Sequence, residues 1–113
     1  MKFDCHHVAN PGGGHVQDPV FLLHGFPEWS GMYVPMMKFL RDKGVTNSYS
    51  CNQRGYSPEA SPGAVEDYDY DGLKADVLAI ITELGYEKFH LVGHDHGGVL
   101  GWTIAKEADR VLR

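Results

Sequence analysis

The sequence is poor in positive charge and lacks any long apolar run. Ten Lys and Arg residues stand against 15 Asp and Glu residues, so the formal net charge is −5 with histidine neutral. Because no basic tract is present to neutralise phosphates, we expect no nucleic-acid partner and no binding to an anionic membrane surface. No apolar run approaches the length of a membrane span, and no export signal is evident. We therefore predict a cytoplasmic protein.

Cysteine is scarce as well, with only Cys5 and Cys51 in the chain. Their spacing matches neither a C-x-x-C motif nor a disulfide framework, and we interpret both as free thiols in a reducing compartment. Apolar residues make up 42% of the chain and charged residues 22%, which is enough apolar surface for a core and excludes disorder by composition. We predict one folded unit over residues 1–113.

Short apolar runs alternate with helical patterns along the chain. Strands are predicted over residues 20–23, 46–52 and 89–92, helices over 32–40, 73–84 and 99–108, and a loop over 54–62. Asp69 or Asp71 is the predicted N-cap of the second helix, and Gly85 lies past its end. The alternation predicts an α/β fold with a mostly parallel sheet flanked by helices, although the strand over 46–52 is unusually polar. In such sheets ligands bind at the carboxyl ends of strands.

One of these carboxyl ends carries Gly-His-Asp-His-Gly at residues 93–97, between a predicted strand and a predicted helix. A side chain held on so sharp a turn needs flanking glycines, and the pattern is that of a nucleophile elbow with Asp95 in the place of serine. A carboxylate at a helix N-terminus is favoured in its ionised form and attacks a saturated carbon without a base. We predict that Asp95 is a nucleophile; the alternative is that it only caps the helix.

Three motifs occur in order: His-Gly-Phe-Pro-Glu at 24–28, Gln-Arg-Gly-Tyr-Ser-Pro at 53–58 and Gly-His-Asp-His-Gly-Gly at 93–98. Together they resemble the α/β-hydrolase superfamily, most closely its epoxide hydrolase and haloalkane dehalogenase branch. The resemblance implies an α/β-hydrolase fold, a small-molecule substrate and no cofactor. It implies that Asp95 forms an alkyl-enzyme ester, which a histidine-activated water hydrolyses, and that the backbone N–H groups of Phe26 and His96 form the oxyanion hole.

The chain also departs from this family. Relatives place the triad acid and histidine after the nucleophile, whereas the 18 residues after Asp95 contain no histidine beyond His96. The cap domain and the C-terminal strands of the family have no counterpart, and Asn52 stands where relatives typically have Asp. We therefore expect the chain to resemble the N-terminal half of a hydrolase, to leave the outer edge of strand 89–92 open, and to be inactive beyond one turnover.

The residues around Asp95 bear on the subfamily. Haloalkane dehalogenases usually place Trp after the nucleophile and often Asn in the oxyanion motif, where this chain has His96 and Phe26. Fluoroacetate dehalogenases carry arginines where this chain has His96 and Val99. Epoxide hydrolases need no halide site, and the motif at 24–28 suits them. We predict an epoxide hydrolase-like enzyme; the alternatives are a dehalogenase-like enzyme or a non-catalytic binding protein of the same fold.

The remaining candidate residues have simpler interpretations. His94 and His96 form an H-x-H pair, but no further ligand pattern accompanies them, so we predict no metal site. We predict that His24 is a packed, hydrogen-bonded residue of the pocket and not an acid or base. Trp29 either lines the pocket or packs in the core. We expect His6, His7 and His15 to be solvated and Gly12, Gly13 and Gly14 to form a turn.

Overall fold

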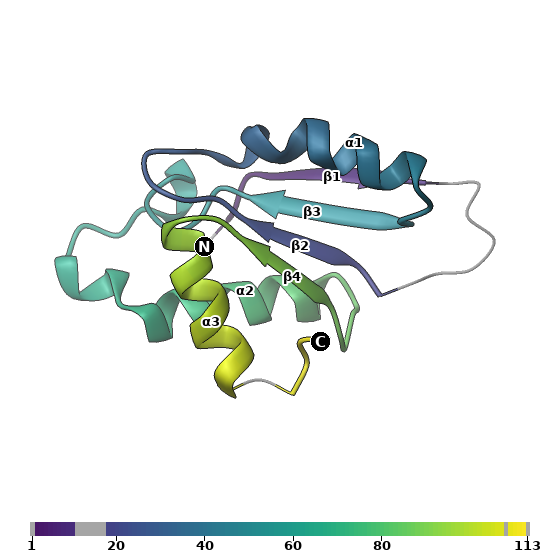
Figure 1. Ribbon diagram of the computed structural model, residues 1–113. Coiled ribbons are helices and arrows are strands. Elements are labelled where there is room, and N and C mark those ends of the chain that lie inside the picture. Colours follow the sequence, from purple (N-terminus) through teal and green to yellow (C-terminus); the bar gives the residue numbers. More distant parts are fainter. Residues whose placement is uncertain (1, 11–17, 108, 113) are drawn as a thin grey trace.

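The computed structural model describes residues 2–10, 18–107 and 109–112, and in it one sheet lies between two layers of helices (Figure 1). The strands are β1 (Cys5–Ala9), β2 (Val20–Leu23), β3 (Asn47–Cys51) and β4 (His90–Gly93). The helices are α1 (Val34–Asp42), α2 (Tyr70–Glu83) and α3 (His96–Glu107), with short 3-10 helices at Ser30–Tyr33, Pro58–Ala60 and Val65–Tyr68. In the described ranges, no helix has the length and apolar character that crossing a membrane requires.

The sheet has the strand order β1-β3-β2-β4. Strand β2 pairs in parallel with β3 and β4, which confirms the predicted α/β fold with a mostly parallel sheet. Strand β1 was not predicted, and it pairs antiparallel to β3 at the edge of the sheet. Its residues alternate between exposed and half-buried, so it lacks the apolar run by which the inner strands are recognised.

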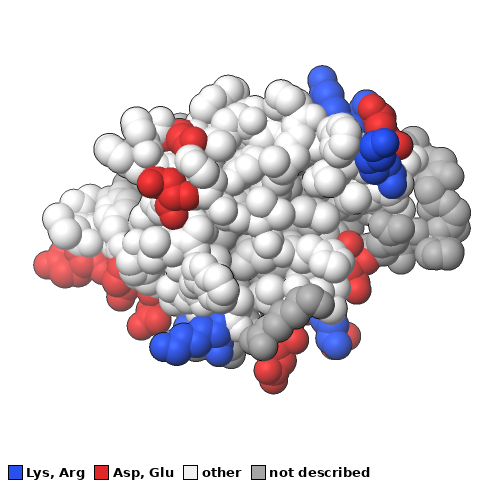
Figure 2. Space-filling view, in the orientation of Figure 1, with Lys and Arg blue, Asp and Glu red and all other residues white. Residues whose placement is uncertain are grey.

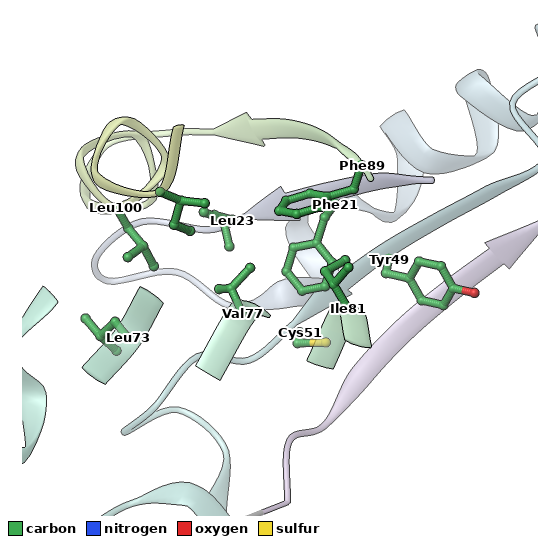
Figure 3. Close-up of a cluster of buried hydrophobic side chains, with 10 residues drawn as sticks. Phe21, Leu23, Tyr49, Cys51, Leu73, Val77, Ile81, Phe89 and Leu100 are labelled. Carbon is green, nitrogen blue, oxygen red and sulfur yellow. The ribbon is translucent and has the colours of Figure 1, made fainter. Parts of the chain in front are cut away.

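The core lies on both faces of β2, as expected for a short strand that is wholly apolar. Phe21 and Leu23 belong to the cluster that includes Leu100 of α3 (Figure 3). Leu22 lies in a second cluster with Met37 of α1. The first cluster comprises Phe21, Leu23, Tyr49, Cys51, Leu73, Val77, Ile81, Phe89, Leu100 and Ile104. Burying a side chain of this size contributes about 1.5–3 kcal/mol. These contacts fix the ends of β2 and β4, where the candidate site lies.

Strand β3 forms in spite of its polar composition. Its neighbours β1 and β2 pair with it on both sides, and the ladder hydrogen bonds outweigh the low strand propensity of its residues. Ser48 and Ser50 pair with Val20 and Leu22, and both serines are fully buried. Within the described part of the chain, neither serine hydroxyl has a hydrogen-bond partner.

The two cysteines are not free thiols. Cys5 and Cys51 lie opposite each other in the β1–β3 ladder, with their Cα atoms 3.9 Å apart, and a disulfide joins them. The prediction of free thiols was wrong because 46 positions separate the two residues, and only the pairing of an unpredicted strand brings them together. The argument for a reducing compartment loses its basis, since disulfides persist in oxidising surroundings.

The helix ends follow local signals. Asp69 is the N-cap of α2 and accepts a hydrogen bond from the backbone N–H of Gly72 (2.8 Å), while Gly85 follows the helix with φ of +89°. Helix α3 begins at His96, three residues earlier than predicted, because the turn after β4 leads straight into it. The predicted turn at Gly12, Gly13 and Gly14 and the prediction for His15 lie outside the described residues.

The outer edge of β4 is open along most of its length. Among the residues that the structure describes, only Phe89, directly before β4, has a neighbour on this side. Its N–H donates to the carbonyl of Arg110, its carbonyl accepts from the N–H of Leu112, and Val111 bridges it in parallel. Beyond this bridge the edge borders an apolar hollow of about 350 Å³, beside which Trp102 is 80% exposed. The expectation of an open edge therefore agrees with the structure over the described residues.

Candidate active site

The candidate site lies at the carboxyl ends of β2 and β4, which are neighbours in the sheet (Figure 1). Leu23 pairs with Gly93 at the last position of the two strands, and the N–H of His94 donates to the carbonyl of Leu23 (3.2 Å). The loop over residues 24–28 and the turn over 93–98 consequently leave the sheet side by side. The position agrees with the expectation for ligands in parallel sheets.

Asp95 lies on a tight turn. Its φ of +58° makes it the one residue other than glycine with positive φ in the described part of the chain, a conformation that costs about 1–3 kcal/mol. A Cβ atom on Gly97 would overlap the carbonyl oxygens of Leu23 and His24, and one on Gly93 would overlap the backbone of Gly97. The flanking glycines are therefore required by close backbone approach, as the motif predicts.

The carboxylate of Asp95 is exposed and accepts backbone hydrogen bonds. The N–H groups of His96 and Phe26 donate to it, in the case of Phe26 to Oδ2 at 3.1 Å, and the imidazoles of His94 and His96 lie nearby. The two hydrogen bonds, with a smaller contribution from the imidazoles, hold the pKa of Asp95 below its ordinary value. Asp95 is consequently ionised at neutral pH.

The structure thus brings together the three groups that the motifs single out. Phe26 and Asp95 are 69 positions apart in the sequence, and both N–H groups predicted for the oxyanion hole point at the carboxylate of Asp95 itself. This approach depends on Gly25, where a Cβ atom would come within 2.6 Å of the Cβ of Asp95. The side chain of Phe26 is 71% exposed, so only its backbone takes part in these contacts.

His24 is a buried, neutral residue beneath the site. Its Nδ1 bonds to the carbonyl of Gly25 (2.9 Å), and its Nε2 accepts a hydrogen bond from the N–H of Gln53 (3.1 Å). Its ring packs edge-on against Tyr56, with centroids 4.7 Å apart. Burial lowers the pKa of His24, which keeps the imidazole uncharged. The structure places this residue in a hydrogen-bonded network and away from solvent, where it does not line an open pocket.

Trp29, His6 and His7 lie closer to the surface than His24 does. Trp29 is 57% exposed and packs edge-on against His6, which excludes the core position. His6 is half-buried and bonds to the hydroxyl of Ser30 (2.9 Å), so it is only partly solvated. His7 is exposed, yet it stacks on Tyr49 with ring centroids 4.3 Å apart.

Glu28 is a site residue that the sequence analysis missed. Its Oε1 accepts hydrogen bonds from the N–H of Gly25 (2.6 Å) and from Nδ1 of His94 (3.1 Å), so it joins the two loops of the site. The only signal for it in the sequence is its place as the last residue of the motif at 24–28. This carboxylate holds the loop that carries Phe26 against the turn that carries Asp95.

Residues of the motif at 53–58 stabilise the site through hydrogen bonds. The side-chain amide of Gln53 donates to the carbonyl of His24 (2.6 Å), and Arg54 donates to both carboxylate oxygens of Asp76 on α2 (2.7 and 2.8 Å). Asn52, which stands where relatives typically have Asp, accepts a hydrogen bond from the N–H of Ser30 (2.8 Å). Neither Gln53 nor Asp76 was expected to contribute, because their partners are distant in the sequence.

No group of three metal-ligating side chains occurs among the residues that the structure describes. His94 and His96 point to different partners: His94 bonds to Glu28, and Nδ1 of His96 lies 3.2 Å from the hydroxyl of Tyr70. The two histidines therefore have separate hydrogen-bond partners in this structure. The site consists of a carboxylate, backbone N–H donors and the hydrogen-bonded loops that position them.

The sequence of the chain is similar to those of known proteins. Residues 18–113 match the family of the alpha/beta hydrolase fold. The chain is 38% identical over 101 residues to epoxide hydrolase 4 of Mus musculus, covering 88% of this chain and 27% of the mouse protein. It is 38% identical over 93 residues to epoxide hydrolase A of Mycobacterium tuberculosis, covering 81% of this chain and 29% of that protein. The chain thus spans about a quarter to a third of the length of these relatives.

Solved structures agree with this similarity. Epoxide hydrolase A from Mycobacterium thermoresistibile matches with a TM-score of 0.80 and 31% identity, covering 97% of this chain and 37% of that chain. An epoxide hydrolase from an endophytic Streptomyces matches with a TM-score of 0.80 and 28% identity, covering 97% of this chain and 35% of that chain. The motifs, the sheet and these matches agree, and the chain belongs to the α/β-hydrolase fold family.

Proposed function

We propose that the protein is a hydrolase that opens small epoxides through a covalent ester on Asp95. The observation that carries the proposal is the Asp95 carboxylate, which lies ionised and exposed on a glycine-flanked turn with the N–H groups of Phe26 and His96 donating to it. A carboxylate that only caps a helix does not require positive φ. The same geometry suits a nucleophile presented to a substrate above the sheet.

The two carboxylate oxygens have different tasks in this mechanism. One oxygen attacks a carbon of the epoxide, the carbon–oxygen bond of the ring breaks, and the released alkoxide takes up a proton from water to give a hydroxyl. Oδ2, held by the N–H of Phe26, remains as the carbonyl oxygen of the ester. When water attacks this ester, the oxyanion develops on the same oxygen, and the N–H groups stabilise it. Release of a diol restores the carboxylate.

The second step requires a base to activate water. The sequence after Asp95 supplies no histidine beyond His96, which stands next to the nucleophile and bonds to Tyr70. We therefore propose that the 113 residues by themselves form the ester and turn over at most once. The alternative is that a protein of this fold uses the site to bind a small molecule without turnover.

The surroundings of Asp95 suit an uncharged epoxide better than an alkyl halide, which releases a halide ion, or an anionic substrate. Figure 2 shows uncharged and acidic side chains on the upper left of the face in view, the region where β2 and β4 end in Figure 1, and the Lys and Arg side chains of this face lie elsewhere. Phe26 contributes no side-chain donor for a departing halide, and the named relatives reported above are epoxide hydrolases. These observations support the epoxide over the alkyl halide.

Alkylation of Asp95 is the direct test. The protein is incubated with a small epoxide, digested and analysed by mass spectrometry for a peptide that has gained the mass of the epoxide at Asp95. The Asp95→Asn variant should lose this adduct, whereas Asp71→Asn, which removes an exposed carboxylate of α2, should retain it. If the wild-type protein binds the epoxide but never carries an adduct at Asp95, the non-catalytic alternative holds.

A further inference from the structure

Gln53 holds His24 from two sides. Its backbone N–H donates to Nε2 of His24 (3.1 Å), and its side-chain amide donates to the carbonyl of the same residue (2.6 Å). Gln53 is 7% exposed and His24 is fully buried, so water does not compete for either bond. Gln53 follows the end of β3 by two residues, and its backbone is therefore anchored to the sheet.

His24 transmits this constraint to the loop above it. Because Nε2 accepts the hydrogen bond from Gln53, the proton of the neutral ring lies on Nδ1, which donates to the carbonyl of Gly25 (2.9 Å). The carbonyl of Gly25 and the N–H of Phe26 belong to the same planar peptide group. Holding the carbonyl on one side therefore aims the N–H on the other side, which donates to Asp95.

We propose that Gln53 is a positioning residue for the nucleophile. By fixing the tautomer and the orientation of His24, it fixes the direction of the Phe26 N–H and hence the environment of the Asp95 carboxylate, although Gln53 touches neither. The effect on ester chemistry rests on the function proposed above. The effect on the free carboxylate does not, and it is measurable without substrate.

A purely structural role explains Gln53 less well. Its Oε1 is buried and has no hydrogen-bond partner in the described part of the chain. An unpaired buried acceptor costs free energy, so stability alone would not favour glutamine at this position. The Nε2–H of the same amide is the group that the carbonyl of His24 requires. A glutamine whose acceptor is unpaired and whose donor holds the His24 carbonyl fits a role in orienting His24.

The test is an NMR titration of the Asp95 side-chain carboxyl and of the Phe26 amide in the substrate-free protein. Gln53→Met keeps the backbone N–H that bonds to Nε2 of His24 but loses the side-chain donor to the His24 carbonyl. In this variant we expect the titration midpoint of Asp95 to rise and the pH-linked shift of the Phe26 amide proton to shrink. In Ser50→Ala, which removes a buried hydroxyl without a bond to His24, both should match the wild type. His94, His96 and Glu28 lie near the site, so their midpoints are followed in the same spectra.

A folded Gln53→Met protein in which Asp95 and Phe26 titrate as in the wild type would overturn the proposal. Should this variant fail to fold, the ring nitrogen shifts of His24 in the wild type decide: a protonated Nδ1 and an accepting Nε2 support the proposal, and the opposite tautomer refutes it. These measurements need no epoxide. A missing adduct on Asp95 therefore counts against the proposed hydrolase and leaves the role of Gln53 to the titration.

Discussion

The backbone N–H of Phe26 donates a hydrogen bond to Oδ2 of Asp95 across 69 positions of sequence. This hydrogen bond joins the loop after β2 to the turn after β4. Together with the N–H of His96, the N–H of Phe26 donates to a carboxylate that is otherwise exposed. In the structure the two donors therefore bind the carboxylate that we propose as the nucleophile. This arrangement favours the ionised form of the carboxylate.

The pH dependence of ester formation should reflect this arrangement. The hydrogen bonds from His96 and Phe26 hold the pKa of Asp95 below its ordinary value of 3.8, so the carboxylate is still mostly ionised when the pH has fallen to 3.8. We expect the yield of the Asp95 adduct to hold from neutral pH down to this point and to fall only at lower pH. A short peptide with one aspartate, treated in parallel, should lose reactivity earlier. Equal pH midpoints for protein and peptide would contradict the prediction.

Replacing Gly97 should damage the site and the fold together. The added Cβ in Gly97→Ala would overlap the carbonyl oxygens of Leu23 and His24, which belong to a buried strand end and cannot move aside. We expect a loss of about 1–3 kcal/mol or more in the free energy of unfolding, measured by denaturant titration. Gly63→Ala, where a Cβ meets nothing within 4 Å, should be nearly neutral. Similar losses for both variants would show that steric overlap is not the cause.

The ion pair between Arg54 and Asp76 should be important for stability. Its side chains are only 13% and 12% exposed, and Asp76→Ala leaves the guanidinium of Arg54 without its carboxylate. We expect the free energy of unfolding to fall by about 3–5 kcal/mol. The matched control is Asp71→Ala, since Asp71 is 83% exposed and its pair with Lys74 spans 3.7 Å. That variant should lose about 1 kcal/mol or less.

Two buried serines should respond in opposite directions to the same change. Ser50 has a hydroxyl without a partner among the described residues, so Ser50→Ala should leave stability unchanged or raise it by about 1 kcal/mol. The hydroxyl of Ser57 donates to the carbonyl of Asn52 (2.6 Å) and accepts from the N–H of Asp4 (3.0 Å), and Ser57→Ala should lower stability by about 1–3 kcal/mol. Thermal and denaturant unfolding of both variants provide the measurement. A loss in Ser50→Ala as large as in Ser57→Ala would contradict the assignment.

The disulfide should stabilise the protein through the edge strand. Reduction removes the covalent link between β1 and β3 and restores the freedom of a 46-position loop to the unfolded chain. We expect the free energy of unfolding to fall by about 2–4 kcal/mol on addition of a reductant. The double variant Cys5→Ser and Cys51→Ser should be insensitive to the reductant. If the wild type is equally insensitive, or its mass shows two free thiols, the disulfide does not contribute as expected.

The sequence by itself determined the elements whose signals are local. The apolar run at 20–23 predicts a strand buried on both faces, and the N-cap Asp69 with Gly85 delimits helix α2. The glycines around Asp95 predict a tight strand-to-helix turn, because only glycine allows such close backbone approach. Each of these features depends on residues that lie only a few positions apart, so its physical cause can be identified from the sequence alone.

Only the tertiary structure decided which distant residues meet. Strand β1 has no apolar run and forms because β3 offers an edge to pair with, and this pairing in turn brings Cys5 to Cys51. Gln53 reaches His24, and Phe26 reaches Asp95, only because β2 is parallel to both β3 and β4. A hydrogen bond or an ion pair forms where the fold brings two suitable groups close together and shields them from water. Which groups come close cannot be deduced from their positions along the chain.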